Sequence, residues 1–446
     1  MSTLPRPKTT VSLGHPLSRD PRRPHVVRVG LLGLGNVGQA VARLFAGSRG
    51  LLRRRGIDLL VAGALVRDAV RAREFAPRDT LLTDDPEQFF AQPYDLVIEV
   101  RGGVHAAFDY IARCLRAGVP VVTANKSLMA ARGVELFQLA AENGTALRCE
   151  ASAIAGVPFL SALRDRPMIA RVSRLAGILN GTSNYIVSSM AESGLSFADA
   201  LRSAQEKGYA EPDPTFDVQG IDAAEKLIVI LQHLGITGVR TASLEIVGID
   251  RLRTTDFEQA AVFDGVIKPV ACAAITDDEV HAFVGPAFVP RTHPLAAVSY
   301  VRNGICLSGR EIGDLVFTGP GAGPEVTAGT ILDDATQIVT EGADVLPPAV
   351  TLGSNDRRAV APASAWFVRC VLPAGGTSEA AVRNVRDVLA SSGVSVRRAS
   401  FTADAAGCWV VYALTAVREP AVIHDAVAAL RLTTGGEATA LRVLGD

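Results

Sequence analysis

A charged stretch, EPDPTFDVQGIDAAEK at 211–226, carries five carboxylates and one lysine and runs directly into the apolar LIVIL. Asp222 and Lys226 are four residues apart, so a helix places them on one face. On a helix surface such a pair contributes roughly 0.3–0.5 kcal/mol, and that ordinary role stays open. The helix that follows is apolar almost all round, as buried helices are, which favours an internal cleft. A zwitterionic amino-acid substrate would supply the partners that buried charges need.

A second candidate site lies at NGT, residues 180–182, where a predicted strand ends and a helix through Tyr185–Met190 begins. Backbone N–H groups at the N-terminus of a helix attract anions. Thr182 and the start of this helix therefore form a candidate cradle for a substrate carboxylate.

Polar residues also follow several buried strands. Glu99, the TANK segment at 123–126 and Glu150 all stand at predicted strand ends. In doubly wound sheets, ligands bind beyond the carboxyl ends of the strands. Lys126 is placed to reach the nicotinamide side of a cofactor, although a helix-capping or solvent-facing lysine would fit the same position.

The glycine pattern GLGNVG fits G-x-G-x-x-G and lies between a β-branched strand and a helix, the context that makes the pattern informative. Gly33 permits the tight turn, Gly35 lets a pyrophosphate approach the backbone, and Gly38 lets the helix pack against the strand. Asn36 and Val37 begin that helix, whose N–H groups face the phosphates of a dinucleotide. A purely structural glycine turn is the alternative.

The second strand ends at VRD, where Arg67 precedes Asp68. An acidic residue here takes the ribose 2′-hydroxyl of NAD, whereas an arginine suits the 2′-phosphate of NADP. Because Arg67 comes first, the sequence favours NADP and leaves NAD open. A surface arginine at a strand end is the other interpretation.

Buried strands alternate with helices through the first third of the chain, which indicates an α/β fold with a Rossmann-type, doubly wound parallel sheet. From about residue 156 the predicted helices are mixed with β-rich runs, as in an α+β domain. The last segment predicts the order βαββαβ, which is that of a ferredoxin-like unit. The expected parts are a disordered extension at 1–25, an NAD(P)-binding domain at 26–155 with a return segment at 317–347, a catalytic domain at 156–316, a linker near 348–364 and the ferredoxin-like domain at 365–446.

The composition excludes several classes of protein. The chain has 446 residues, 48% of them hydrophobic and 20% charged, as expected of a multidomain globular protein. A net charge of −1 argues against nucleic acid or an anionic membrane as partner, and no apolar run reaches a membrane span. Six scattered cysteines without a Cys-x-x-Cys pair indicate reduced thiols in a cytoplasmic protein. Residues 1–25 lack the apolar core of a secretion signal, and an organelle transit peptide stays a minor alternative.

Five stretches together resemble the homoserine dehydrogenase family: GLGNVG, TANK, EASAIAGVP, GILNGTSNYI and GYAEPDPTFDVQGIDAAEK, in the family's order. The last two are highly specific, and the likeness covers about residues 27–345. The βαββαβ tail is similar to an ACT regulatory domain, which many members carry. The resemblance implies NAD(P)H-dependent reduction of L-aspartate 4-semialdehyde to L-homoserine, on the route to threonine, methionine and isoleucine.

The resemblance also implies roles for single residues. Lys226 and Lys126 are the candidates for proton transfer to the aldehyde oxygen, since a nearby ammonium can donate a proton while hydride adds to the carbonyl carbon. The implied substrate residues are Glu211 and Asp222 for the amino group, with Asp217, Tyr209, Thr182 and Gly181 lining the pocket. The implied cofactor residues are Gly33, Gly35, Asn36, Val37, Gly38, Arg67, Thr123, Lys126 and Gly321.

The segment EASAIAGV resembles the family's monovalent-cation loop, with the Glu150 side chain and the backbone carbonyls of Ala153, Ala155 and Val157 as ligands for Na⁺ or K⁺. Oxygen-only ligands suit a hard cation. From the residues alone, Glu150 could equally cap a helix or join an ion pair.

Two features depart from the family pattern. Arg101 stands where members usually have an apolar residue, beside the expected nicotinamide site, and the tail reads LPAGGTSEAAV in place of a Pro-Gly-Val-Leu turn. Weak or absent inhibition by threonine is therefore expected. The alternatives are another amino-acid oxidoreductase, which the charged loop disfavours, and a cofactor-binding regulatory protein, which Arg101 keeps open. The resemblance implies a homodimer or homotetramer, paired through the second domain, that acts on a small molecule and on neither nucleic acid nor membrane.

Overall fold

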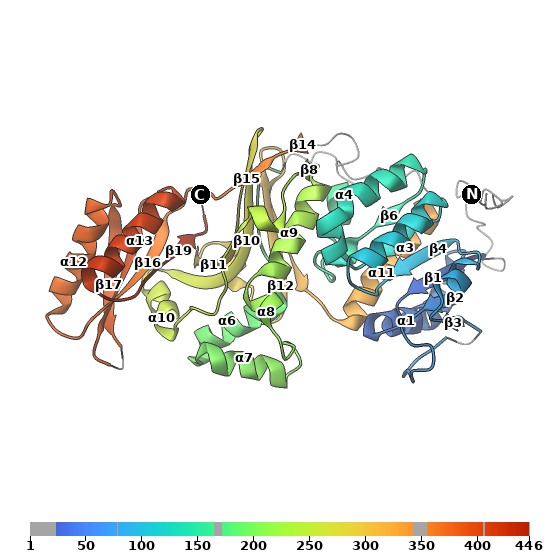
Figure 1. Cartoon of the computed structure of the whole chain (residues 1–446), viewed down its shortest axis with the longest axis horizontal. Helices are drawn as coiled ribbons and strands as arrows, with labels where there is room; N and C mark the ends of the chain where they lie inside the picture. Colours follow the sequence, from blue (N-terminus) through green and yellow to red (C-terminus); the bar gives the residue numbers. More distant parts are fainter. Residues whose placement is uncertain (1–23, 78, 165–171, 342–354, 405, 446) are drawn as a thin grey trace. The chain divides into compact units, whose positions relative to one another are not determined.

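The structure is a computed structural model that describes residues 24–77, 79–164, 172–341, 355–404 and 406–445. Two compact units make up the described residues (Figure 1). The first takes 24–164, 232–235 and 322–341, and the second takes 172–231, 236–321 and 355–445. The predicted disordered extension lies, apart from Pro24 and His25, outside the described residues. In the described ranges, no helix is both long and apolar enough to cross a membrane.

The first unit is built on a six-stranded parallel sheet with the strand order β3-β2-β1-β4-β5-β6. Its strands are mostly buried, as expected of parallel strands covered by helices. This order is that of a Rossmann-type sheet, so the predicted fold class is confirmed. The elements are β1 (His25–Leu32), α1 (Asn36–Arg54), β2 (Ile57–Leu65), β3 (Leu81–Thr83), α2 (Pro86–Phe90), β4 (Leu96–Glu99), α3 (His105–Arg116), β5 (Val121–Thr123), α4 (Lys126–Glu142), β6 (Leu147–Arg148), η1 (Glu150–Ser152) and α5 (Phe159–Arg164).

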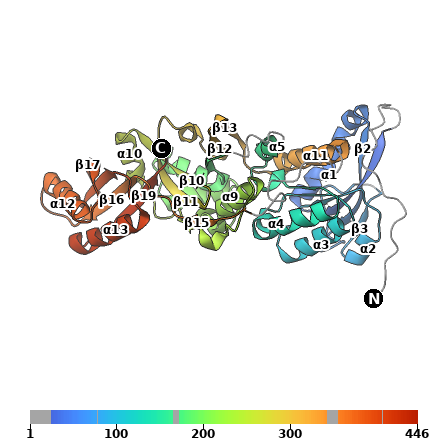
Figure 2. The same cartoon turned by 90° about the horizontal axis from the view of Figure 1, so that it is seen from above.

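Helix α11 (Pro324–Glu341) returns to the first unit and lies beside α1 (Figure 2). Ile331 and Ile338 of α11 share one apolar core with Val41 of α1 and with β1. The return segment predicted at 317–347 begins too early, because the chain as far as Pro320 forms strand β13 of the second unit. Residues 342–347 lie outside the described ranges.

The second unit holds a mixed sheet of eleven strands with the main order β13-β12-β7-β10-β11-β19-β16-β18-β17, and β9 and β15 pair with β11 beside it. Long antiparallel pairing joins β10 to β11 in the middle of this order and β12 to β13 at one edge. The strands before the tail are β7 (Arg174–Ile178), β8 (Ile236–Thr237), β9 (Glu245–Ile246), β10 (Gly265–Ile275), β11 (Glu279–Pro290), β12 (Arg302–Gly309) and β13 (Gly313–Pro320). The helices are α6 (Gly181–Ser193), α7 (Phe197–Glu206), α8 (Thr215–Val218), α9 (Ile221–His233), η3 (Thr241–Ser243), α10 (Thr254–Val262) and η4 (Pro294–Ala297).

The tail has the predicted βαββαβ order: β16 (Trp366–Leu372), α12 (Ser378–Ser391), β17 (Val396–Ala403), β18 (Trp409–Thr415), α13 (Pro420–Thr434) and β19 (Ala438–Val443). Helices α12 and α13 pack on one face of its antiparallel strands (Figure 1). On the other face, Phe367 and Tyr412 join the core of α6 and α10. Strand β19 also pairs in parallel with β11, with Phe288 opposite Val443. The tail sheet is therefore a continuation of the sheet of the second unit.

A buried ion pair fastens the tail to α10. Arg369 of β16 donates to the carboxylate of Asp256. The Tyr412 hydroxyl donates to the same carboxylate at 3.0 Å, and its oxygen lies at hydrogen-bond distance, 2.8 Å, from the Thr255 hydroxyl. The backbone N–H of Arg253 donates to Asp256 Oδ2 at 2.8 Å, so this carboxylate also caps α10.

The linker predicted near 348–364 is not a free linker in its described part. Strand β14 (Asn355–Asp356) pairs with β8, and β15 (Arg358–Val360) pairs with β11. The bridge between Ser364 and Arg418 then leads into the tail. Residues 348–354 lie outside the described ranges.

Candidate active site

The glycine loop of the first unit joins β1 to α1. Gly33 has a φ of +110°, and its N–H donates to Leu65 O at 2.9 Å. A Cβ added at Gly38 would lie 2.4 Å from Gly33 O, whereas one at Gly35 would meet nothing within 4 Å. Gly35 and Asn36 are exposed, and the half-buried Val37 follows them in the first turn of α1. Gly33 and Gly38 thus pack tightly against each other, whereas the space beside Gly35 is open. A pyrophosphate site requires this open space next to the backbone.

The segment after β2 is rich in arginine. Asp68 Oδ1 accepts the backbone N–H groups of Val70 and Arg71 at 2.9 and 3.0 Å, so this carboxylate is already engaged. Arg73 donates to the carbonyls of Asp68 and Arg71, both at 2.7 Å. Arg67 is exposed and, in the described part of the chain, makes no hydrogen bond or ion pair. Arg71 and Arg73, which sequence reasoning did not single out, add positive charge to the same segment.

Glu99 at the end of β4 organises the neighbouring turn. Its carboxylate accepts the N–H groups of Arg101 and Gly102 at 2.8 and 3.1 Å and the Thr123 hydroxyl at 2.7 Å. Burial raises the pKa of Glu99 above that of an ordinary glutamate. Thr123 is fully buried, so its hydroxyl supports this turn. Lys126 is the first residue of α4 and is half-buried.

Arg101 lies against the glycine loop through its backbone, since a Cβ at Gly33 would lie 3.0 Å from Arg101 N. Its guanidinium sits 5.4 Å from the centroid of the Tyr110 ring, on the helix that follows. A guanidinium at this distance from an aromatic ring is attracted to its face. The Arg101 guanidinium, which departs from the family pattern, is thus held by the Tyr110 ring of α3.

The residues of the predicted cation loop are already hydrogen-bonded. Glu150 accepts the N–H groups of Leu160 and Ser161 at 2.9 and 2.6 Å, which makes it the cap of α5, one of the roles that its sequence position allowed. The carbonyl of Ala155 accepts the Thr330 hydroxyl, and that of Val157 accepts a backbone N–H at 2.9 Å. Ala153 ends η1. Among the described residues, no three His, Cys, Asp or Glu side chains form a metal cluster.

Asp334 of α11 lies next to Glu150, whose N–H donates to Asp334 Oδ2 at 3.1 Å. Burial raises the pKa of both carboxyls, that of Asp334 well above its ordinary value. Each oxygen of this set keeps a further lone pair. Two buried acids beside two carbonyls are compatible with a small hard cation.

In the second unit, the charged loop and the NGT segment meet. Lys226 Nζ lies 2.9 Å from Asp222 Oδ2 and donates to the carbonyl of Leu179 at 2.8 Å. Asn180 Nδ2 donates to Asp217 Oδ1 at 2.7 Å and to Asp222 Oδ2 at 2.8 Å. Asp222 and Lys226 are 4% and 8% exposed, so this is not a surface ion pair. A buried ammonium held by a carboxylate and a carbonyl is a suitable proton donor.

The N-terminus of α6 borders this cluster. Asn180 is its N-cap, and its Oδ1 accepts the Ser183 N–H at 2.7 Å. The Thr182 hydroxyl donates to Tyr209 O at 2.7 Å, which ties the helix start to the charged loop. The Tyr209 side chain is 44% exposed, and Glu211 is exposed. The structure thus brings Gly181, Thr182, Asp217, Asp222 and Lys226 together, with Glu211 on the loop beside them.

Sequence reasoning missed Asn180, which joins the helix cap to both carboxylates. The signal was its position at the end of a strand, directly before the first helical residue. Gly321, a predicted cofactor residue, follows β13, and a Cβ added there would lie 2.3 Å from the Asn303 side chain.

A Rossmann-ordered sheet with an open glycine loop, joined in one chain to a buried lysine–carboxylate cluster, is the arrangement of a dinucleotide-dependent oxidoreductase. A family model described as the NAD-binding domain of homoserine dehydrogenase matches residues 33–150, and the homoserine dehydrogenase model matches 158–336. The chain belongs to the homoserine dehydrogenase family, and the predicted family is confirmed.

Individual relatives agree with the family models. The homoserine dehydrogenase of Bacillus subtilis is 35% identical over 316 residues, 70% of this chain and 73% of that protein. The homoserine dehydrogenase of Mycobacterium tuberculosis H37Rv is 39% identical over 315 residues, 69% and 71% of the two chains. The solved structure of a homoserine dehydrogenase from Thiobacillus denitrificans matches with a TM-score of 0.86 at 29% identity, over 94% of this chain and 98% of that one.

Proposed function

We propose that this chain reduces L-aspartate 4-semialdehyde to L-homoserine, with NADPH as the hydride donor, in the synthesis of threonine, methionine and isoleucine. The observation that carries the proposal is the buried cluster of Asp217, Asp222, Lys226 and Asn180 at the start of α6. Its charges match an amino-acid aldehyde, because carboxylates attract the substrate ammonium and a lysine faces the reacting oxygen.

In this mechanism Lys226 donates the proton that converts the aldehyde oxygen to a hydroxyl. Asp222 holds the Lys226 ammonium in position and, with Glu211 and Asp217, attracts the substrate amino group. Positive charge beside the carbonyl oxygen also stabilises the oxyanion that develops there. Lys126 is the second candidate for the proton transfer.

The remaining pocket residues would fix the other end of the substrate. Thr182 and Gly181 present the N-terminus of α6 to the substrate carboxylate. Tyr209 lies on the loop whose carbonyl accepts the Thr182 hydroxyl, so it would close the side of the pocket.

A bound nicotinamide cofactor supplies the hydride. The glycine loop, from Gly33 through Gly35, Asn36 and Val37 to Gly38, would hold its pyrophosphate, and Arg67 its 2′-phosphate. Arg71 and Arg73 add positive charge to the segment of Arg67, which favours NADP over NAD. Thr123 and Lys126 lie at the end of β5, beyond which ligands bind in sheets of this kind, and Gly321 completes the proposed set.

We further propose that the loop of Glu150, Ala153, Ala155 and Val157 holds a monovalent cation, Na⁺ or K⁺. The buried carboxyls of Glu150 and Asp334 would gain a counter-charge from it, and the loop offers only oxygen ligands.

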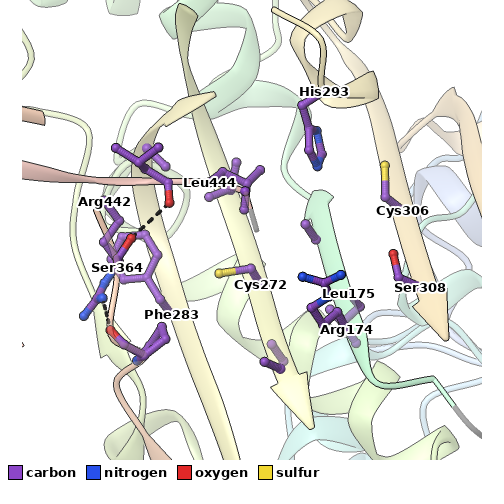
Figure 3. A pocket seen from close by; sticks show the side chains of 18 of the residues that line it. Arg174, Leu175, Cys272, Phe283, His293, Cys306, Ser308, Ser364, Arg442 and Leu444 are labelled. Atoms are coloured by element: carbon purple, nitrogen blue, oxygen red, sulfur yellow. Dashed lines mark hydrogen bonds between the residues drawn. The ribbon is translucent and has the colours of Figure 1, made fainter. Parts of the chain in front are cut away.

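The proposed assembly is a homodimer or homotetramer paired through the second unit. A groove of about 360 Å³ lies on one face of its sheet (Figure 3). Leu175, Cys272, Cys306 and Leu444 give it an apolar lining. A second copy of the chain would cover this face. The molar mass in solution tests the assignment, with Val316→Asp on the lining expected to lower it.

The tail is proposed to be an ACT-like regulatory domain. Threonine is expected to inhibit the enzyme through it weakly or not at all. The proposed location is the cytoplasm, where the six unpaired thiols of the chain would stay reduced.

The decisive experiment follows NADPH oxidation with L-aspartate 4-semialdehyde as substrate. Turnover that depends on both compounds, and reverses with L-homoserine and NADP⁺, supports the proposal. A purified, folded chain that binds NADPH without turnover in either direction would instead be a cofactor-binding regulatory protein.

A further inference from the structure

Asn303 on β12 is an exception to the rule that buried polar groups find partners. Its side chain is 0% exposed, and neither Oδ1 nor Nδ2 has a hydrogen-bond partner within the described residues. Burying both ends of an amide unpaired lowers the stability of a protein. Each such group in a folded protein therefore calls for an explanation, such as a ligand that supplies the partner.

The position of Asn303 connects it to the proposed substrate site. Gly304 pairs with Ile178 on β7, so the next step of the ladder sets Asn303 opposite Leu179. The carbonyl of Leu179 is the one that accepts Lys226 Nζ at 2.8 Å. Asn303 is therefore one strand away from the residue that holds the proposed proton donor.

Two glycines lie directly against this amide. A Cβ added at Gly181, the first residue of α6, would be 3.4 Å from Asn303 Oδ1. A Cβ added at Gly321 would be 2.3 to 2.4 Å from the amide atoms, so the Gly321 backbone lies over the amide. Between the N-terminus of α6 and the Asn303 amide thus lies Gly181, which has no side chain to separate a ligand from the amide.

A second amide in the first turn of α6 is also incompletely paired. Asn184 Nδ2 donates to Val298 O and Arg302 O at 3.3 and 3.1 Å, while its buried Oδ1 has no partner among the described residues. The Asn184 amide is therefore oriented by the backbone, but that of Asn303 is not. Because no partner fixes either end of Asn303, the side chain can present its NH₂ group to an incoming acceptor.

We infer that Asn303 is a substrate-binding residue whose Nδ2 donates to the α-carboxylate of the amino-acid substrate at the N-terminus of α6, an assignment that rests on the proposed function. A hydrogen bond to an ionised carboxylate is stronger than one between neutral groups. Binding then requires the Gly321 backbone to shift from its place over the amide.

The test compares Asn303→Leu with the unaltered enzyme. Leucine has a similar size and removes both unpaired atoms, so the melting temperature of the free protein should stay the same or rise. The KM for L-aspartate 4-semialdehyde should rise about ten- to a hundredfold while NADPH affinity stays unchanged. Asn303→Asp should raise this KM further, because it sets a second carboxylate against that of the substrate.

The substrate group is identified in the oxidation direction. The unaltered enzyme should prefer L-homoserine to 3-aminopropan-1-ol, which lacks the carboxylate, and Asn303→Leu should remove most of that preference. Thr237→Val is the matched control, since Thr237 Oγ1 is another buried, unpartnered atom of the described second unit but lies on β8. This variant should leave both the melting temperature and the KM values near those of the unaltered enzyme.

An Asn303→Leu enzyme with a lower melting temperature and an unchanged KM would overturn the inference, as would equal losses for homoserine and the aminoalcohol. If the leucine variant does not fold, Asn303→Ala is subjected to the same substrate comparison. Failure of the unaltered enzyme to oxidise L-homoserine refutes the proposed function itself, which separates the two outcomes.

Discussion

Asp222–Lys226 and Asp256–Arg369 are both buried ion pairs of the second unit, with side-chain exposures of 6% and 11% in the first and 3% and 5% in the second. The first joins residues one turn apart on α9. The second joins α10 to strand β16 of the tail, across 113 residues of sequence. Both carboxylates have a further donor, Asn180 in one case and Tyr412 in the other.

The difference between the two pairs lies in the cation and its surroundings. An arginine keeps its proton at any ordinary pH and offers a rigid fork of donors, so Arg369 suits a permanent connection. A lysine can release a proton, and Lys226 lies beside a helix N-terminus and an exposed loop. Buried charge by itself therefore does not identify a catalytic group.

The largest effect on turnover is expected from Lys226→Met, which removes the ammonium group proposed to donate the proton and keeps most of the side-chain volume. Loss of a general acid typically lowers kcat by about 10²–10⁴-fold. Lys268→Met is the matched control, because Lys268 Nζ is also buried and donates to a backbone carbonyl, Val298 O, at 2.8 Å. Steady-state kinetics should show loss of turnover only in the first variant, with NADPH binding retained. Near-normal turnover of Lys226→Met would transfer the proton donor to Lys126.

Arg369→Met should affect stability instead of catalysis. Removing one partner of a buried pair costs about 3–5 kcal/mol, because Asp256 would keep its charge without a cation. Denaturant unfolding should show this loss while kcat of the folded enzyme is preserved. Adding Asp256→Asn neutralises the remaining charge, so the double variant should recover much of the stability. A kcat that falls along with stability would mean that the two pairs are coupled.

Asp222→Asn tests whether the first pair also serves the substrate. The change removes the charge that is proposed to face the substrate ammonium and keeps the shape of the side chain. Losing a hydrogen bond to a charged group costs about 1.5–3 kcal/mol, so the KM should rise by roughly ten- to a hundredfold. Unchanged kinetics would make this pair as structural as Asp256–Arg369.

Arg67→Ala extends the comparison to a cation that is exposed. Only NADPH carries a 2′-phosphate, so its affinity should fall about tenfold while that of NADH changes little. Binding titrations with the two cofactors provide the measurement. Equal losses for both would show that Arg67 is not the group that discriminates between them.

The sequence predicted the parallel sheet, the glycine loop and the Asp222–Lys226 pair because each depends on local spacing. Strand β3 was missed, since it is three residues long and carries no periodic signal. The role of Arg369 was also missed, although a charge inside the apolar WFVRCVL run was visible. Its partner, Asp256, lies 113 residues away in sequence, and the two meet where the tail sheet packs against α10. The pairing of β19 with β11 makes the tail sheet continuous with the sheet of the second unit, which local spacing in the sequence could not show.

The strand pairing that joins the end of the chain to β11 has a consequence for synthesis. Ribosomes add about 5–20 residues per second, and domains tend to fold as they emerge. Here the partners of Ala287 and Phe288 are Arg442 and Val443, so the sheet that carries the candidate active site cannot be completed until these residues, about 150 positions further along the chain, have been made. Until then β11 would offer unpaired backbone groups to other chains, a hazard that chaperones are suited to limit. A nonsense codon anywhere in the tail should therefore yield an aggregating protein rather than a shortened enzyme.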